Sequence, residues 1–218
     1  MIPTRPLADR RAALKKRHRQ AIVEAAAALM TEVGSIGFTV DDLAARADVS
    51  RRTVFNHFAS VDDIVTEVCA GILGGVVDGF VARASEASAD GGSASSMFDE
   101  VAYALRTTDL VTPMAYLTRT LGVAQDPTPW RAALMLRSVH DVSARFAHAM
   151  AERHPEADPL AVELLVNSLM TGLMVLHGHW YAATGGADDA ASREVWSELV
   201  ERLVSTVRAG YAAADAHR

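Results

Sequence analysis

A short basic segment combines the side-chain types that recognise nucleic acid. Arg51, Arg52, Thr53, Asn56 and His57 follow one another closely within the stretch from Thr39 to Phe58, TVDDLAARADVSRRTVFNHF. Arginine can donate to guanine edges or to phosphates, asparagine can pair with adenine, and threonine can touch a thymine methyl group. A histidine here suits a phosphate better than a base. If the segment is a helix, these side chains face outward together, and contact with DNA is the chemistry they favour.

A short helix should precede this segment and help to position it. The Thr39 hydroxyl can accept a hydrogen bond from an otherwise unpaired amide at the start of that helix. Asp41 and Asp42 suit the positive end of the helix dipole. The apolar face of the helix would consist of residues at helical spacing, Val40, Leu43, Ala44 and Ala47.

The turn between the two helices is Asp48-Val49-Ser50. Asp48 stands where a left-handed residue is needed, Val49 can enter the core between the helices, and Ser50 begins the second helix. The residues of that helix that can pack inward are Val54, Phe55 and Phe58. The pattern predicts a helix-turn-helix, a motif whose second helix enters the DNA major groove.

The groups expected at the DNA extend beyond the second helix. A basic run from Arg10 to Arg19 precedes the motif, and it either contacts the minor groove and backbone or is a solvated tail. Thr39 is primarily a helix cap, with its amide or hydroxyl near a phosphate. The complete set of predicted DNA-binding residues is Arg17, Thr39, Ser50, Arg51, Arg52, Thr53, Phe55, Asn56 and His57.

The distribution of charge agrees with this interpretation. The chain has 21 basic and 27 acidic residues, a net charge of −6. Residues 1–60 contain ten basic and six acidic residues, a net charge of +4, so the rest of the chain carries −10. A basic amino-terminal part on an acidic body shows where phosphates can dock.

Length and cysteine content limit the class of protein. A chain of 218 residues can bury a sizeable core, as one large domain or as a small domain and a larger one. The single cysteine, Cys69, excludes an internal disulfide framework and suits a reducing cytoplasm. We find neither an apolar run of about 20 residues nor the apolar segment of a signal peptide. We therefore expect a cytoplasmic protein with no membrane contact.

The periodicity along the chain predicts an all-α fold. We expect a disordered basic arm over residues 1–14, a helix-turn-helix DNA-binding domain over 15–60, and a helical regulatory and dimerisation domain over 61–218. Gly34 should end the first helix, and Ser60 to Asp63 resembles a capping box. The predicted helices span about 16–33, 39–47, 50–58, 60–84, 96–106, 109–122, 129–154, 160–184 and 192–213, with flexible residues at 85–95.

Residues from about Arg17 to Val68 resemble the DNA-binding region of the TetR (tetracycline-repressor-like) family of transcriptional regulators. The matching segment is FTVDDLAARADVSRRTVFNHFASVDDIV, with the helix before it and the all-helical body after it. The resemblance implies a homodimer that binds a palindromic operator in double-stranded DNA and is released by a small molecule bound in the larger domain.

Some positions depart from the pattern of the family. Asp48 stands where the family usually has glycine, and Phe55 and His57 stand where it usually has tyrosine. Val61 replaces a lysine that usually touches a phosphate, so we expect one backbone contact fewer.

The larger domain must supply the dimer interface. Two long predicted helices carry apolar stripes, in which Ser168 and Gly172 permit close approach of the backbones. A helix that is apolar on more than one face requires a partner, and a four-helix bundle with two helices from each subunit provides one. Burial of both helices within one monomer is the alternative. The stripes consist of Leu165, Leu169, Leu173 and Leu176, and of Trp196, Leu199, Val200, Leu203, Val204 and Val207.

Large and polar side chains within the central helices are candidates for an effector pocket. Most large apolar residues of a helical domain are plain core, whereas a buried polar group needs a partner that a ligand can supply. Methionine-rich walls adapt to flexible apolar ligands, so an apolar or acyl-type molecule with a polar or anionic head is the expected effector. The predicted ligand-binding residues are Tyr103, Tyr116, Arg119, Trp130, Arg137, Asn167, Met170, Met174, His177 and Tyr181.

The sequence gives little support for a catalytic or a metal site. His177 and His179 are two residues apart, so on a helix they point in different directions and cannot share an ion. Cys69 has no partner at metal-ligand spacing, and we find neither a phosphate-binding loop nor a nucleophile with a neighbouring base. We expect no catalytic residue, no metal and no cofactor.

Three hypotheses follow for the function of the chain. The first is a homodimeric transcriptional regulator, a repressor released by a ligand. The second keeps the DNA binding but makes the body a protein-interaction module or an activator without a small-molecule ligand. The third is a helical enzyme with an incidental helix-turn-helix. Specific binding of an operator by the pure protein would argue against this hypothesis.

Overall fold

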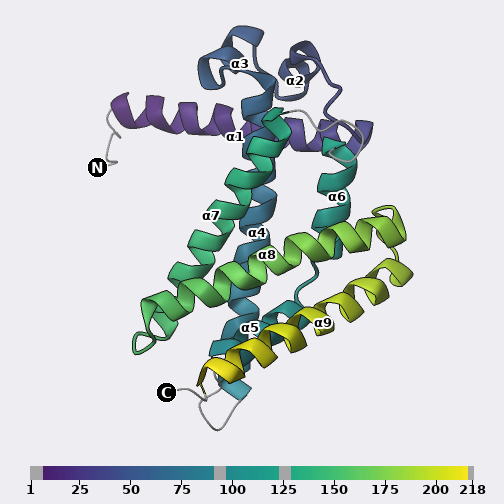
Figure 1. Ribbon diagram of the computed structural model, residues 1–218. Coiled ribbons are helices and arrows are strands. Elements are labelled where there is room, and N and C mark those ends of the chain that lie inside the picture. The colour runs from purple at the N-terminus through teal and green to yellow at the C-terminus, as the bar shows by residue number, and fades with distance from the viewer. Residues whose placement is uncertain (1–6, 91–96, 123–128, 216–218) are drawn as a thin grey trace. The chain divides into compact units, whose positions relative to one another are not determined.

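The computed structural model describes residues 7–90, 97–122 and 129–215, and within these ranges every regular element is a helix (Figure 1). The all-α prediction is confirmed. The elements are α1 (Leu7–Val33), α2 (Val40–Arg46), α3 (Arg51–His57), α4 (Val61–Asp90), α5 (Met97–Thr107), α6 (Val111–Leu121), α7 (Pro129–Arg153), α8 (Pro159–Thr184) and α9 (Ala190–Asp215).

The chain forms two compact units. The amino-terminal unit comprises residues up to Gly71 together with a short segment that begins at Arg119, and the carboxy-terminal unit contains most of the remainder. The division therefore falls within α4 and not at residue 60, where the sequence placed it. The first turns of α4 belong to the amino-terminal unit because they bury Ile64, Val65 and Val68 there.

Helix α1 is longer than the sequence suggested. It begins at Leu7, not near Lys16, so residues 7–14 are helical and the prediction of a disordered arm is wrong for them. Residues 1–6 lie outside the described part. The charged stretch LADRRAALKK consists almost entirely of strong helix formers, and both early prolines precede it in the sequence. At the other end, Gly34 has φ +68° and ends the helix as predicted.

The core of the amino-terminal unit is small and tightly packed. Helix α1 packs against α2 and α3, and α2 packs against α3. The side chains that fill the space between the helices are at most 8 % exposed. They are Ile22, Ala25, Ala26, Met30, Phe38, Leu43, Ala44, Val54 and Phe58.

Arg19 of α1 joins three elements of the amino-terminal unit through one guanidinium group. Its Nε and Nη2 donate to the two carboxylate oxygens of Glu67 on α4, at 3.0 and 2.5 Å, and its Nη1 donates to the carbonyl oxygen of His57 at 3.0 Å. Its Cζ also lies 4.2 Å from the centre of the Phe58 ring. The sequence grouped Arg19 with the DNA-facing basic run, but these contacts make it a structural residue.

A second two-pronged ion pair joins α1 to α2. Arg46 donates from Nη1 and Nη2 to the two carboxylate oxygens of Glu32, at 3.0 and 2.5 Å. The hydrogen bonds from Arg46 lower the pKa of the Glu32 carboxyl. Both side chains are exposed, so solvent screens the pair and it contributes orientation more than stability.

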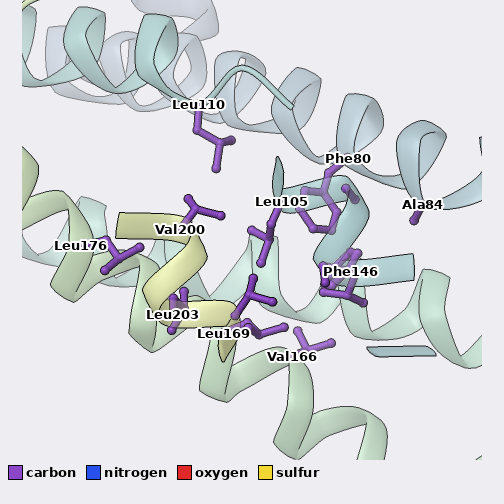
Figure 2. Close-up of a cluster of buried hydrophobic side chains, with 14 of the residues drawn as sticks. Phe80, Ala84, Leu105, Leu110, Phe146, Val166, Leu169, Leu176, Val200 and Leu203 are labelled. Carbon is purple, nitrogen blue, oxygen red and sulfur yellow. The ribbon is translucent and has the colours of Figure 1, made fainter. Parts of the chain in front are cut away.

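The carboxy-terminal unit is built around one hydrophobic cluster. Side chains from α4 to α9 meet in it, with Phe80 of α4 and Phe146 of α7 in edge-to-face contact at 4.6 Å between ring centroids (Figure 2). Helix α8 packs along α9 and against α7. Gly172 makes the close approach of α8 and α9 possible, because a Cβ at that position would collide with the side chain of Leu203. Ser168, in contrast, is exposed.

A buried carboxylate ties α5 to the end of α7. Glu100 is 3 % exposed, and its Oε2 accepts hydrogen bonds from Arg153 Nη2 at 3.0 Å and Nε at 3.3 Å. His154 Nε2 lies 3.1 Å from the same oxygen. Arg153 also donates from Nη1 to Ser85 Oγ at 2.7 Å. A buried charge requires such partners, so the cluster fixes α5 relative to α4 and α7.

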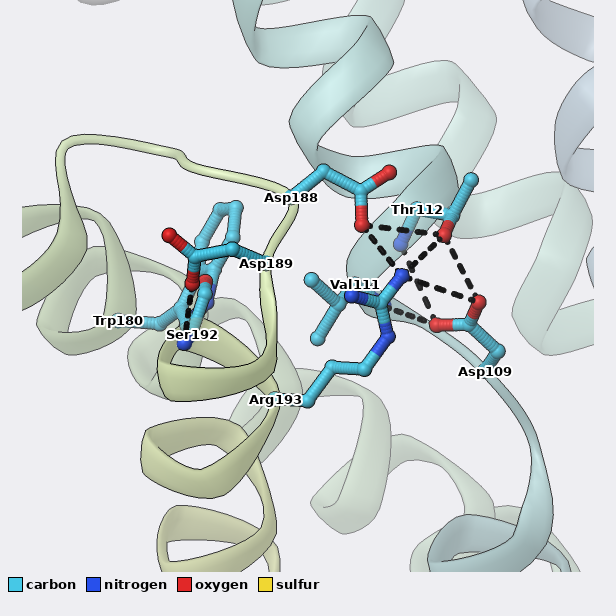
Figure 3. Close-up of polar contacts among 8 residues, drawn as sticks. All are labelled: Asp109, Val111, Thr112, Trp180, Asp188, Asp189, Ser192 and Arg193. Atoms are coloured by element: carbon cyan, nitrogen blue, oxygen red, sulfur yellow. Dashed lines mark hydrogen bonds and ion pairs between the residues drawn. The ribbon is translucent and has the colours of Figure 1, made fainter.

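Polar contacts join the start of α6 to the start of α9 (Figure 3). Asp109 Oδ1 accepts from the amides of Val111 and Thr112 at 3.1 and 3.3 Å, which caps α6. Arg193 of α9 donates to the Thr112 hydroxyl at 3.0 Å and pairs with Asp188. This cluster holds the turn between α8 and α9 against α6.

The predicted boundaries of the other helices are close to the observed ones, with one exception. Helix α4 continues to Asp90, whereas the sequence placed flexible residues from Ser85 onward. Alanine and glutamate in SEASAD sustain the helix in spite of the serines. Two segments, Val61–Glu86 and Pro159–Thr184, are long and apolar enough by composition to cross a membrane, a test that core helices also pass.

We predict that Arg19→Ala destabilises the amino-terminal unit by about 1–2 kcal/mol, since it removes charge-assisted hydrogen bonds that are partly screened by solvent. Urea unfolding measures the loss. Arg17→Ala, which removes an exposed arginine from the same helix, is the control and should change the free energy of unfolding by less than about 0.5 kcal/mol. Equal stabilities of the two variants would contradict the structural role of Arg19.

Candidate nucleic-acid interface

Helix α3 has the start that the sequence predicted. Ser50 is its N-cap, with an extended backbone, and its hydroxyl accepts a hydrogen bond from the amide of Thr53 at 3.1 Å. The hydroxyl of Thr53 lies 2.9 Å from the same oxygen. These contacts hold the first turn of α3 and leave its outer face to the residues that follow.

The outer face of α3 presents Arg51, Arg52, Phe55 and Asn56, all exposed. Thr53 and His57 are half-buried at its edges. The expectation that Phe55 packs inward is wrong, because its side chain is 51 % exposed. Only Val54 and Phe58, four residues apart, face the core, and Phe55 is rotated about 100° from Val54. Phe55 therefore remains a candidate for DNA contact alone.

The two arginines of α3 differ in their surroundings. Arg51 Nη1 donates to Asp41 Oδ2 of α2 at 3.0 Å, and both side chains are largely exposed. Arg52 has no ion-pair partner among the described residues. An exposed ion pair contributes little to stability, so breaking the pair of Arg51 with Asp41 to contact DNA would cost little free energy. Arg52 could contact DNA without breaking an ion pair.

Thr39 and Asp42 form a capping box at the start of α2. The Thr39 hydroxyl accepts from the amide of Asp42 at 3.1 Å, and the Thr39 amide donates to Asp42 Oδ2 at 2.9 Å. The predicted cap is present, and the box engages both Thr39 groups that we expected near a phosphate. The Thr39 hydrogen bonds lower the pKa of Asp42. A depressed pKa means that the box stabilises the fold fully above pH 3.8 and progressively less as the pH falls further.

The turn between α2 and α3 depends on a left-handed residue. Asp48 has φ +52°, the one positive φ among the described residues other than glycine. Its amide donates to the carbonyl oxygen of Ala45 at 3.3 Å, and the amide of Val49 donates to that of Ala44 at 3.0 Å. Asp48 thus takes the conformation predicted for it, which aspartate adopts less readily than glycine.

The basic residues of α1 surround His57. The rings of His18 and His57 are 6.1 Å apart, edge to face. Partial burial is the largest cause of the lowered pKa of His57, and the charges of His18, Lys15 and Arg19 add to it. The smaller, electrostatic part of the shift reflects positive charge around His57, and positive charge attracts phosphate. Arg11, Lys15, Lys16 and Arg17 are exposed on the same helix.

The match to a protein-family model identifies this motif. The model of bacterial regulatory proteins of the tetR family matches residues 22–68, from α1 to the first turns of α4. Residues 22–68 are a tetR-type DNA-binding region. Its helix-turn-helix is α2 and α3, and Ser60, whose hydroxyl accepts from the amide of Asp63 at 3.1 Å, caps the helix that follows.

One solved structure extends the likeness to the fold of most of the chain. A TetR-family transcriptional regulator from Mesorhizobium loti is 19 % identical, with a TM-score of 0.57, over 88 % of this chain and 97 % of that one. A gamma-butyrolactone receptor, an ArpA-like protein, is 16 % identical over 88 % and 98 % of the two chains, with a TM-score of only 0.35. No curated protein matches the chain.

The residues predicted for an effector lie on four helices, α5 to α8. Tyr103, Arg137, Asn167 and Met174 are exposed, and Asn167 Nδ2 donates to the carbonyl oxygen of Glu163 at 2.8 Å. Arg119 is exposed and belongs to the amino-terminal unit. The Trp130 side chain lies outside the described part. Those that are half-buried are Tyr116, Met170, His177 and Tyr181.

His177 has a partner within the protein. Its Nε2 lies 2.9 Å from the hydroxyl of Thr118 on α6, and burial lowers the pKa of the imidazole. Met170 and Tyr181, on the same helix, pack against the hydrophobic cluster. The polar group that seemed to need a ligand is thus satisfied, and it would reach an effector only by exchanging this hydrogen bond.

Acidic, histidine and cysteine residues do not form a metal site in the part of the chain described: no group of three or more lies close enough to hold an ion. Cys69 is 2 % exposed, and burial raises the pKa of its thiol to about 11. It is a small core residue, as expected.

Sequence reasoning missed two residues of the candidate interface: Asp41, which pairs with Arg51, and His18, whose ring lies beside that of His57. Neither has a signal in the spacing of residues.

We predict that Asp48→Gly stabilises the protein by about 0.5–1 kcal/mol, because glycine adopts positive φ without the steric cost that aspartate pays. Asp48→Ala should destabilise it, since alanine lacks the polar side chain that eases the left-handed conformation. Chemical denaturation of the three proteins measures the order. Equal stabilities of the glycine and alanine variants would show that the turn does not require this conformation.

We predict that Arg52→Ala weakens binding to the operator by about 10- to 100-fold, the cost of one lost arginine contact to a base. Fluorescence anisotropy measures the affinity at two salt concentrations, because a phosphate contact would instead lower the salt dependence. Arg83→Ala is the control: Arg83 is exposed on α4, pairs with Glu86 at 2.9 Å, and should leave binding unchanged. Unaltered affinity of the Arg52 variant would show that α3 is not the recognition helix.

Proposed function

We propose that this TetR-family regulator is a homodimeric repressor that binds a palindromic DNA operator and is released by a small molecule. It acts by binding and not by catalysis. The observation that supports the DNA contact best is the outer face of α3, where Arg52 and Asn56 project from a capped helix after a left-handed turn. Such a face fits the hydrogen-bonding groups of the major groove.

Charge supports the same orientation. The exposed cations of α1 lie on the element that packs against α3, and the pKa of His57 is depressed partly by its positive neighbours. Phosphates on either side of the groove would neutralise these groups. Several phosphate contacts make binding fall steeply with salt concentration, which is the expected signature of this interface.

The dimer is supported by the exposed side of α8. One face of the helix is buried in the hydrophobic cluster through Leu165, Leu169 and Leu176. On other faces Leu160, Leu164 and Val175 are 60 %, 58 % and 57 % exposed. A helix that is apolar on more than one face needs a second partner, and the same helix of another subunit, related by a two-fold axis, supplies an apolar surface that matches it.

A two-fold axis also explains a palindromic operator. Two copies of α3 must enter successive major grooves, about 34 Å apart, so any shift in their separation weakens binding. A small apolar or acyl-type effector that binds one state of the larger domain better would change the population of the competent state. Tyr116, Met170, His177 and Tyr181, half-buried on α6 and α8, remain the predicted contacts closest to the core.

The test combines DNA binding with the state of assembly. We expect the protein to bind its own upstream intergenic DNA in the presence of scrambled competitor, and to sediment as a dimer. Leu164→Glu should yield monomers that bind the DNA at least ten-fold more weakly, because charge on the exposed stripe prevents the helices from pairing. Leu136→Glu, at a leucine of α7 that is 70 % exposed, is the control.

Two results would separate the alternatives. A dimer that binds DNA specifically but shows no change in operator affinity or melting temperature with any small molecule would favour an activator or a protein-interaction regulator. A Leu164→Glu variant that still sediments as a dimer would overturn the assignment of α8 to the interface.

A further inference from the structure

Two histidines meet at the end of the candidate recognition helix. His57 is the last residue of α3, His18 lies in the middle of α1, and their ring centroids are 6.1 Å apart in an edge-to-face arrangement. Both side chains are half-buried. An imidazole becomes charged only when it takes up a proton, which histidine does close to physiological pH. The pair can therefore change its charge under conditions in which lysine and arginine stay positive.

The fold of the amino-terminal unit holds the two rings together. Arg19 donates from Nη1 to the carbonyl oxygen of His57 at 3.0 Å, and the next residue, Phe58, is buried. Helix α1 packs against α3, which brings His18 to the same place. The position of the pair is thus set by contacts of the backbone and of neighbouring side chains.

The charges that act on His57 are all positive and come from α1. They belong to His18, Lys15 and Arg19, and they add to partial burial, the larger cause, in holding the pKa of His57 below the ordinary 6.5. In the free protein, a further proton at this place is therefore disfavoured by its surroundings. A negative group beside the rings would reverse that effect.

The acidic residues of the neighbouring helices do not supply this negative group. Glu67 of α4 binds Arg19 with both carboxylate oxygens. Asp41 of α2 forms its ion pair at the opposite end of α3. Asp62 and Asp63, at the start of α4, are exposed, and neither contributes to the pKa shift of His57. An anion that balances a proton on the pair must come from outside the protein.

We propose that the His18–His57 pair and Lys15 form a binding site for a backbone phosphate of DNA, and that the pair takes up a proton when this phosphate binds. Charge acts over several ångströms, so the coupling requires a phosphate beside the rings and not a hydrogen bond to a particular nitrogen. The site rests on the proposed contact of α3 with DNA. It does not rest on the sequence of an operator, because every duplex carries phosphates.

Proton uptake makes binding stronger as the pH falls. Fluorescence anisotropy measures the affinity for the upstream intergenic DNA and for a scrambled duplex between about pH 8 and pH 6, the range in which histidine changes its charge. The ionic strength is kept constant, because salt alone changes binding to phosphates. We expect Kd to fall about five- to ten-fold for both duplexes, since one proton gives at most a ten-fold change per pH unit.

Substitution by glutamine removes the titrating group and keeps a polar side chain. His18→Gln and His57→Gln should each reduce the change in Kd to about two-fold or less. Near pH 8, where the pair is neutral, His18→Gln should bind almost as the wild type does, a result that a merely structural role of His18 would not give. His148→Gln is the control, because His148 is a histidine of α7 with a side chain that is 75 % exposed, and it should keep the pH dependence of the wild type.

The outcomes separate this site from the proposed function. Specific binding that does not change with pH would overturn the proton-linked site and leave the DNA-binding regulator standing. Binding that strengthens with falling pH but shows no preference for the upstream DNA would support the site and contradict the operator. Glutamine variants that keep the pH dependence of the wild type would overturn the assignment to these histidines. If the variants fail to fold, calorimetry of the wild type in two buffers of different ionisation enthalpy decides, since an absence of proton uptake overturns the proposal.

Discussion

The guanidinium group of Arg19 holds the end of α3 and the start of α4 against α1. Helix α3 has only seven residues, too few to be stable without packing, so its direction depends on what holds its ends. Arg19 binds the carbonyl oxygen of His57 at the end of α3 and, through Glu67, the second turn of α4. Since one planar group makes both contacts, it couples the positions of α3 and α4 to that of α1.

Charged groups of the molecule fall into two kinds. Many arginines of the described residues pair with carboxylates of their own unit, such as Arg46 with Glu32, Arg106 with Glu201 and Arg153 with Glu100. Arg52 is not, and Arg51 is held only by an exposed pair. Because the structural cations are paired, the arginines of α3 stand out as a defined set of accessible positive groups, and phosphate would not compete for the contacts that hold the fold.

Local chemistry could be predicted from the sequence, and contacts between distant residues could not. The Thr39 cap, the left-handed Asp48 and the end of α1 at Gly34 follow from interactions within a few residues. The partnership of Arg19 with Glu67 spans 48 residues, and that of Thr118 with His177 spans 59, so no spacing rule reveals either. The start of α1 was misplaced because charge density suggested disorder where the helix propensity of the same residues was high.

The single cysteine has a practical consequence for studying this regulator. The Cys69 thiol is 2 % exposed, and its pKa of about 11 leaves almost no thiolate at neutral pH. Alkylating reagents should therefore not react with Cys69 in the folded chain, and should modify its thiol only when the start of α4 unfolds locally. Fluorophores can be attached at cysteines introduced elsewhere without removing the native one. The rate at which Cys69 itself is alkylated would measure how often the amino-terminal unit opens.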